Sequence, residues 1–127
     1  MTKENLEIFE KLNEEFLIDC NRIKYILCQS KDILMRNIEF AEDFRLENGT
    51  VFWEGHEYWS FGGHEHHSGC FDSNYLSMTD EELESIVAKK NKEYEKKMEK
   101  AAREQAKHAK TERFELFQKL KNSSLTN

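Results

Sequence analysis

Apolar residues in the first third of the chain recur at steps of three, four and seven, which is the spacing of one helical face. They are Leu6, Phe9, Phe16, Cys20, Ile23, Leu27, Leu34 and Ala41. A second apolar set beside them, which includes Ile8 and Leu12, makes this face broader than a two-stranded coiled-coil seam. The pattern predicts a helix over residues 3–42. The polar segment 29–32 could kink or break it, with Ser30 as the N-cap of a second piece.

From Phe44 the pattern changes to the alternation that is typical of β-strands. Asn48-Gly49 stands between two β-forming runs, and both positions tolerate the positive φ angles of a two-residue hairpin turn. Strand-like runs follow at residues 56–61 and 66–71, on either side of Gly62-Gly63. We therefore predict a three- or four-stranded antiparallel meander within residues 44–76.

A capping box marks the start of a second long helix. Thr79 is suited to the N-cap and Glu82 to the third helical position, while Met78 and Leu83 can form a hydrophobic staple. The apolar stripe that follows predicts a helix over residues 80–121, and the polar residues 122–127 are expected to be a flexible tail. The chain is thus expected to be an α+β protein with a single domain at residues 1–121.

Composition supports a folded, helix-rich protein. Of 127 residues, 38% are hydrophobic and 35% are charged, and proline is absent. No apolar run approaches the ~18 residues of a membrane span, and the polar N-terminus does not resemble a signal peptide. Three cysteines without a paired spacing argue against a disulfide framework. We expect a protein with reduced cysteines in the cytoplasm.

Charge is divided unevenly along the chain. Residues 89–121 contain twelve Lys and Arg against six acidic residues, whereas the net charge of the whole chain is −6. A basic helix of this kind could bind nucleic acid. Because acidic residues are interspersed, we favour a solvated face or a face that pairs with the acidic N-terminal helix. Lys96 and Lys100 are candidates for contact with a protein partner.

Histidines suggest a zinc site. His64 and His66 would share one face of a strand, and His67 and Cys70 could complete a set of ligands. The spacing matches no strong zinc signature, because Ser68 stands where the HExxH motif requires histidine. These residues are equally suited to ordinary hydrogen bonding at a surface. We expect no cofactor other than zinc at this alternative site.

Catalytic motifs do not emerge from the sequence. Cys70 with His66 or His67 would need an orienting third group and an oxyanion hole, and the sequence indicates neither. The five glycines all occupy turn-like contexts rather than a phosphate-binding loop. We therefore expect a protein that is not an enzyme.

Aromatic residues of the predicted sheet are candidates for binding a partner. Trp53, Tyr58 and Trp59 alternate along a small sheet, so some of them must lie on each face. An exposed aromatic face would mark a binding surface, and the neighbouring Glu54 and Glu57 would contribute charge to it.

The segment from Phe71 to Leu83, FDSNYLSMTDEEL, follows a glycine-rich aromatic hairpin. Over about residues 50–90 the chain resembles small uncharacterised phage and prophage accessory proteins, which join a strand that ends in an aromatic residue to a capped acidic helix. The resemblance implies a mobile-element origin, and inhibition of a bacterial defence system, as by an anti-CRISPR protein, is one task that it suggests. It implies no catalytic residue, and it implies the host cytoplasm as the location if a phage encodes the protein.

Together these patterns predict a non-enzymatic protein-binding module, with a host or bacterial protein as its partner. That partner could itself bind nucleic acid, because acidic residues of the chain could present a phosphate-like surface to it. Two alternatives stay open. One is a zinc-binding domain that uses residues 64–70, and the other is a helical protein that assembles into a homo-oligomer.

Overall fold

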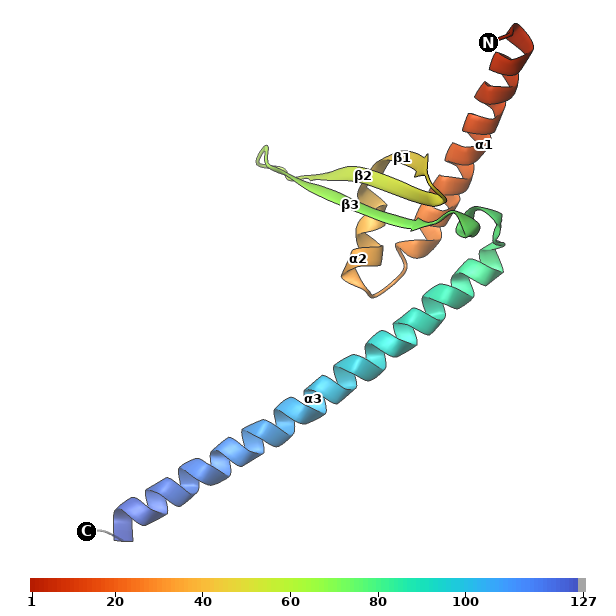
Figure 1. The fold of residues 1–127 in the computed structure, drawn as a ribbon. Coiled ribbons are helices and arrows are strands. Elements are labelled where there is room, and N and C mark those ends of the chain that lie inside the picture. Colours follow the sequence, from red (N-terminus) through yellow and green to blue (C-terminus); the bar gives the residue numbers. More distant parts are fainter. Residues whose placement is uncertain (126–127) are drawn as a thin grey trace. The chain divides into compact units, whose positions relative to one another are not determined.

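The structure is a computed structural model that describes residues 1–125. In chain order, its elements are α1 (Lys3–Leu27), α2 (Ile33–Arg36), η1 (Asn37–Phe40), β1 (Ala41–Glu47), β2 (Thr50–Tyr58), β3 (His64–Asp72), η2 (Ser73–Ser77) and α3 (Asp80–Leu125) (Figure 1). Three antiparallel strands between two long helices confirm the predicted α+β fold class. Among the described residues, no helix combines the length and the hydropathy that a membrane span requires.

Contacts divide the chain into two units, and the boundary lies inside α3. Unit 1 is residues 1–91, and unit 2 begins at Lys92. The predicted single domain of residues 1–121 is divided because α3 contributes Leu83 and Val87 to the core of unit 1. In contrast, residues 92–123 of α3 are exposed, apart from the half-buried Tyr94. The helix continues through Leu125. Of the predicted tail at 122–127, residues 126–127 lie outside the described residues.

The predicted helix over residues 3–42 was wrong in its length, because α1 ends at Leu27. Asp32 caps the short helix α2 by accepting a hydrogen bond from the backbone N–H of Leu34 at 3.0 Å. Ser30, which was proposed as this N-cap, is buried and accepts from the N–H of Asp32 instead. Asn91 of α3 accepts from the N–H of Lys31 at 2.7 Å, so a residue distant in sequence stabilises the break.

The sheet is an antiparallel meander with the strand order β1-β2-β3. Asn48 and Gly49 have φ angles of 50° and 76°, which confirms the predicted hairpin turn. The pairing of β1 with β2 is irregular between Ala41 and Asp43, where Gly55 lies opposite Ala41. A Cβ on Gly55 would lie 1.6 Å from the carbonyl oxygen of Phe40, so this approach of two backbones requires glycine.

Helices of unit 1 cover one face of the sheet. The core joins Cys20, Ile23, Ile26 and Leu27 of α1, Ile38 of η1, Ala41, Val51, Trp53 and Phe71 of the sheet, and Leu83 and Val87 of α3.

At the start of α3, the Thr79 hydroxyl accepts from the N–H of Glu82 at 3.3 Å, which confirms the predicted N-cap. Arg22 of α1 donates to Asp80 at 2.7 Å, and this hydrogen bond raises the pKa of Arg22.

Candidate functional site

The pairing of β2 with β3 places side chains on two faces of the sheet. Val51, Trp53 and Phe71 point toward the core, and we call this side the inner face. Because adjacent residues of a strand point in opposite directions, the residues between them form the outer face. It is exposed or half-buried and includes Arg45, Phe52, Glu54, His56, Tyr58, His64, His66, Ser68 and Cys70.

Trp53 is a core residue, so its predicted role in partner binding was wrong. Its side chain is only 3% exposed. The indole lies against Gly69 of β3, where an added Cβ would come within 2.6 Å of the ring atom Cζ2. Alternation along β2 therefore places Trp53 inward and leaves Glu54 and Tyr58 on the exposed outer face.

The connection between β2 and β3 carries an aromatic tip, which we define as Tyr58, Trp59 and Phe61. These side chains are 69%, 51% and 99% exposed. The Trp59 N–H donates to the carbonyl of Gly63 at 2.8 Å, and the Gly62 N–H donates to the carbonyl of Trp59 at 3.1 Å. A Cβ on Gly63 would lie 2.6 Å from the Trp59 ring, so glycine allows the indole to lie against the turn. A hydrogen-bonded turn thus presents apolar rings to solvent.

Phe61 is the most exposed of the three, and it was missing from the predicted binding residues. Its signal in the sequence was an aromatic residue directly before Gly62-Gly63. A phenylalanine at the turn of a hairpin has no strand neighbour to cover it, so its position in the turn indicated exposure.

The four predicted zinc ligands do not come together. His64, His66 and Cys70 lie on the outer face, whereas His67 points inward with Glu65. On the outer face the rings of His64 and His66 gather around His56, with centroids 5.5 Å and 5.1 Å from its centroid. The nearest carboxylate oxygen to His56 Nδ1 is that of Glu42, at 3.7 Å.

A different group of metal-ligand types meets on the inner face, beyond the apolar core. Glu57 and Glu65 lie directly opposite each other on β2 and β3. His67 Nε2 is 3.1 Å from Glu57 Oε2 and 4.0 Å from Glu65 Oε2. Among the described residues, these three form the candidate metal-binding group, with their ligand atoms within 4.8 Å of one another. Glu57 therefore faces His67 rather than open solvent.

The sheet is strongly acidic. Residues 41–72 contain seven Asp and Glu but a single Lys or Arg, which is Arg45. Glu54 is exposed on the outer face, and Glu65 is exposed near the aromatic tip. A surface that combines apolar rings with negative charge complements a partner with an apolar pocket inside a basic surface.

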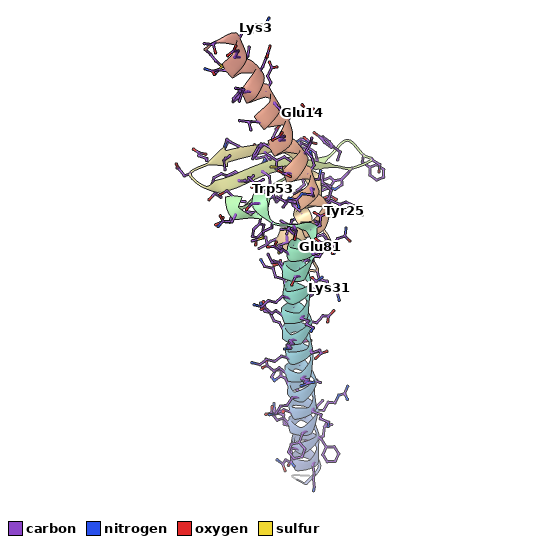
Figure 2. The ribbon with its side chains drawn as sticks, turned by 90° about the vertical axis from the view of Figure 1, so that its right-hand side faces the viewer. Lys3, Glu14, Tyr25, Lys31, Trp53 and Glu81 are labelled. Carbon is purple, nitrogen blue, oxygen red and sulfur yellow. The ribbon has the colours of Figure 1, made fainter. Side chains whose placement is uncertain are left out.

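The first half of α1 carries an apolar face without cover in unit 1. Ile8, Phe9 and Leu12 are 57%, 59% and 59% exposed. They lie on the same helical side as Ile23 and Leu27, which are buried in the core. Figure 2 shows this half of α1, from Lys3 to Glu14, extending beyond the sheet of unit 1.

Unit 2 contains the remaining predicted contact residues. Lys96 and Lys100 are exposed on α3 and belong to this unit rather than to the sheet unit. Farther along α3, Phe114, Leu116, Phe117 and Leu120 are 59–64% exposed. Unit 2 is thus a basic helix with apolar residues near its described end.

The cysteines do not form an obvious reactive centre. All three, Cys20, Cys28 and Cys70, are free thiols. Burial raises the pKa of Cys20 to about 11, and the charge of the adjacent Asp19 adds to this shift. Since the thiolate is the nucleophilic form, Cys20 is a protonated core residue at neutral pH.

Comparison of this chain with models of protein families, with curated proteins and with solved structures found no match.

Proposed function

We propose that this chain is a non-enzymatic protein-binding module whose aromatic tip inserts into an apolar pocket on a partner protein. The observation that carries the proposal is the exposure of Phe61, 99%, on a turn closed by two backbone hydrogen bonds. Exposing such a ring to water is unfavourable, so its burial in an apolar pocket contributes favourable free energy to binding. A turn that already holds its conformation loses little entropy on binding.

Charge favours a basic protein surface as the binding site. The acidic residues of the sheet repel the phosphates of nucleic acid and the anionic lipids of a cytoplasmic leaflet. The same residues attract a surface rich in Lys and Arg, and this attraction accelerates encounter. A protein that itself binds nucleic acid presents such a surface.

Within this class, our more specific proposal is a phage-type inhibitor of a bacterial defence protein, such as an anti-CRISPR protein. The acidic sheet supports this proposal, because it would compete with nucleic acid for the effector. The resemblance of residues 50–90 to phage accessory proteins, which is an expectation from the sequence, is the reason for naming a phage-type inhibitor. We propose the bacterial cytoplasm as the place of action. Three free cysteines agree with a reducing compartment.

Affinity capture from bacterial cells tests the proposal. We expect the wild-type chain to retain a specific protein, and Phe61→Ser to reduce its capture by about tenfold or more, the effect of losing a binding hot spot. Phe114→Ser is the matched control, because Phe114 is also an exposed phenylalanine, at 63%, but belongs to unit 2. Mass spectrometry identifies the protein.

The partner should also be released as salt rises from low to moderate concentration, because charge contributes to the contact. Equal capture by wild type and Phe61→Ser, or binding to anionic vesicles in place of a protein, would contradict the proposal. Purified effector complexes then test the inhibitor role separately, through their nucleic-acid binding.

A second candidate function, assembly into a homo-oligomer, is favoured by the apolar face of α1. We expect light scattering to give a dimer or larger species for the wild type at micromolar concentration, and a monomer for the double variant Ile8→Ser, Leu12→Ser. Ile33→Ser is the control, because Ile33 is 58% exposed and Ile8 is 57% exposed, but Ile33 lies outside α1. A wild-type monomer would exclude this function.

A further inference from the structure

We propose that Glu57, Glu65 and His67 bind one divalent transition-metal ion, with Zn²⁺ as the ion that suits them best, at the base of the aromatic tip. This site differs from the zinc site predicted from the sequence in two of its three residues, and the observations behind it do not depend on the proposed protein binding. It rests on strand register, on the distances between the ligand atoms and on the way His67 is held.

Strand register places two carboxylates where they need a cation. Glu57 and Glu65 are direct partners in the β2–β3 pairing and share the inner face. Like charges directly opposite each other destabilise a sheet. Within the described part of the chain, neither carboxylate has a Lys or Arg within ion-pair distance, and the group that faces both is the His67 imidazole. A bound cation would remove the repulsion between the two glutamates.

His67 is held in the orientation that a ligand needs. Its ring stacks on Phe40 of η1, with centroids 4.8 Å apart and an angle of 18° between the planes. The side chain is only 11% exposed, and Nε2 points toward the carboxylates at 3.1 Å and 4.0 Å. Packing therefore fixes the imidazole before any ion arrives, which lowers the entropic cost of binding.

The distances suit a small ion after one modest movement. Zinc binds imidazole nitrogen and carboxylate oxygen at about 2.0–2.2 Å, and its tetrahedral geometry places two ligand atoms about 3.4 Å apart. The three ligand atoms here lie within 4.8 Å of one another. Glu65 is 56% exposed at its side chain, so it is free to rotate toward the other two ligands by the distance required, which is up to about 1.4 Å.

The three ligands are one imidazole nitrogen and two carboxylate oxygens. Without a thiolate, they do not form the closed, cysteine-based type of structural zinc site. One imidazole and two carboxylates match the ligand types of zinc, manganese and ferrous sites, and three protein ligands leave positions for water or for a group from a partner. The ion would join β2 to β3 at Glu57, the residue before Tyr58, and would thereby hold the aromatic tip in place.

Titration of the purified full chain with ZnCl₂ tests the site. The protein is prepared without a histidine tag and treated with chelator first. We expect one Zn²⁺ per chain by calorimetry and a rise in the melting temperature on binding. The variants Glu57→Gln and Glu65→Gln keep the side-chain shape, and each should weaken binding at least about tenfold, as loss of a metal-site group does.

The double variant His64→Gln, His66→Gln is the matched control, because it removes two imidazoles from the outer face and leaves the inner group intact. It should bind Zn²⁺ as the wild type does. Lack of saturable binding at 100 μM ZnCl₂, or binding that is lost in this control and retained in Glu57→Gln, would overturn the proposal. The apo melting temperatures of the variants report whether each one folds.

Discussion

Replacing Trp53 by alanine is expected to lower the free energy of unfolding by about 3–5 kcal/mol, the usual cost of removing a large aromatic side chain from a core. Trp53 is 3% exposed and lies among buried residues of α1, the sheet and α3. Its loss also leaves a space over Gly69, against which the indole packs. Urea unfolding followed by circular dichroism measures the change.

Trp59→Ala is the matched comparison, because it removes the same side chain from the same hairpin. Trp59 is 51% exposed, so we expect this variant to lose less than about 1 kcal/mol. Equal losses at the two positions would mean that Trp53 is not a core residue. A stable Trp53→Ala variant with impaired partner binding would restore Trp53 to the binding surface.

The second large effect is expected for Gly55→Ala. This variant should lower the free energy of unfolding by about 3 kcal/mol or more, which is the upper end of the range for overpacked positions. The added Cβ would lie 1.6 Å from the Phe40 oxygen and 2.3 Å from its carbonyl carbon. Both atoms belong to the backbone, so no side-chain rotation relieves the clash. The start of β1 would have to move away from β2. Thermal unfolding measures the loss.

Gly62→Ala separates this steric effect from the general cost of replacing a glycine. Gly62 has a φ of 83° and no neighbouring heavy atom within 4 Å of the added Cβ, so only backbone strain of about 1–2 kcal/mol opposes alanine. We expect Gly55→Ala to be the more damaging variant. A Gly55→Ala protein as stable as wild type would show that β1 and β2 do not approach as closely as described.

Local chemistry made two features predictable from the sequence. Asn48-Gly49 adopts positive φ angles because these two residues tolerate them, and it therefore forms the predicted hairpin. Thr79 caps α3 because its hydroxyl reaches the backbone N–H three residues later. In both cases the residues that decide the conformation are neighbours in the chain.

Tertiary contacts explain the errors. The periodicity of residues 3–42 continued across the break after Leu27, because residues such as Leu34 kept the helical spacing. Asn91, which lies sixty residues farther along the chain, stabilises that break, and the sequence near residues 28–32 gives no indication of this contact. Likewise, the choice of inner face for Trp53 and His67 depends on which side of the sheet the helices cover.

The candidate site was predictable only in part. Alternation indicated that aromatic residues would lie on both faces, and Tyr58 and Trp59 are indeed exposed. Register across two strands was needed to bring Glu57, Glu65 and His67 together, because Glu57 is distant in sequence from the other two. The four predicted zinc ligands within residues 64–70 are close in sequence but are divided between the two faces of the strand.

Photo-cross-linking at the aromatic tip tests the central claim, which is binding of a protein through that tip. A photoreactive phenylalanine analogue replaces Phe61 in one variant and Phe114 in another, and both are expressed in bacterial cells and irradiated. We predict a discrete cross-linked product with a specific protein from position 61 that is absent from position 114, and that Trp59→Ala diminishes. No adduct at position 61, or the same set of adducts from both positions, would contradict it.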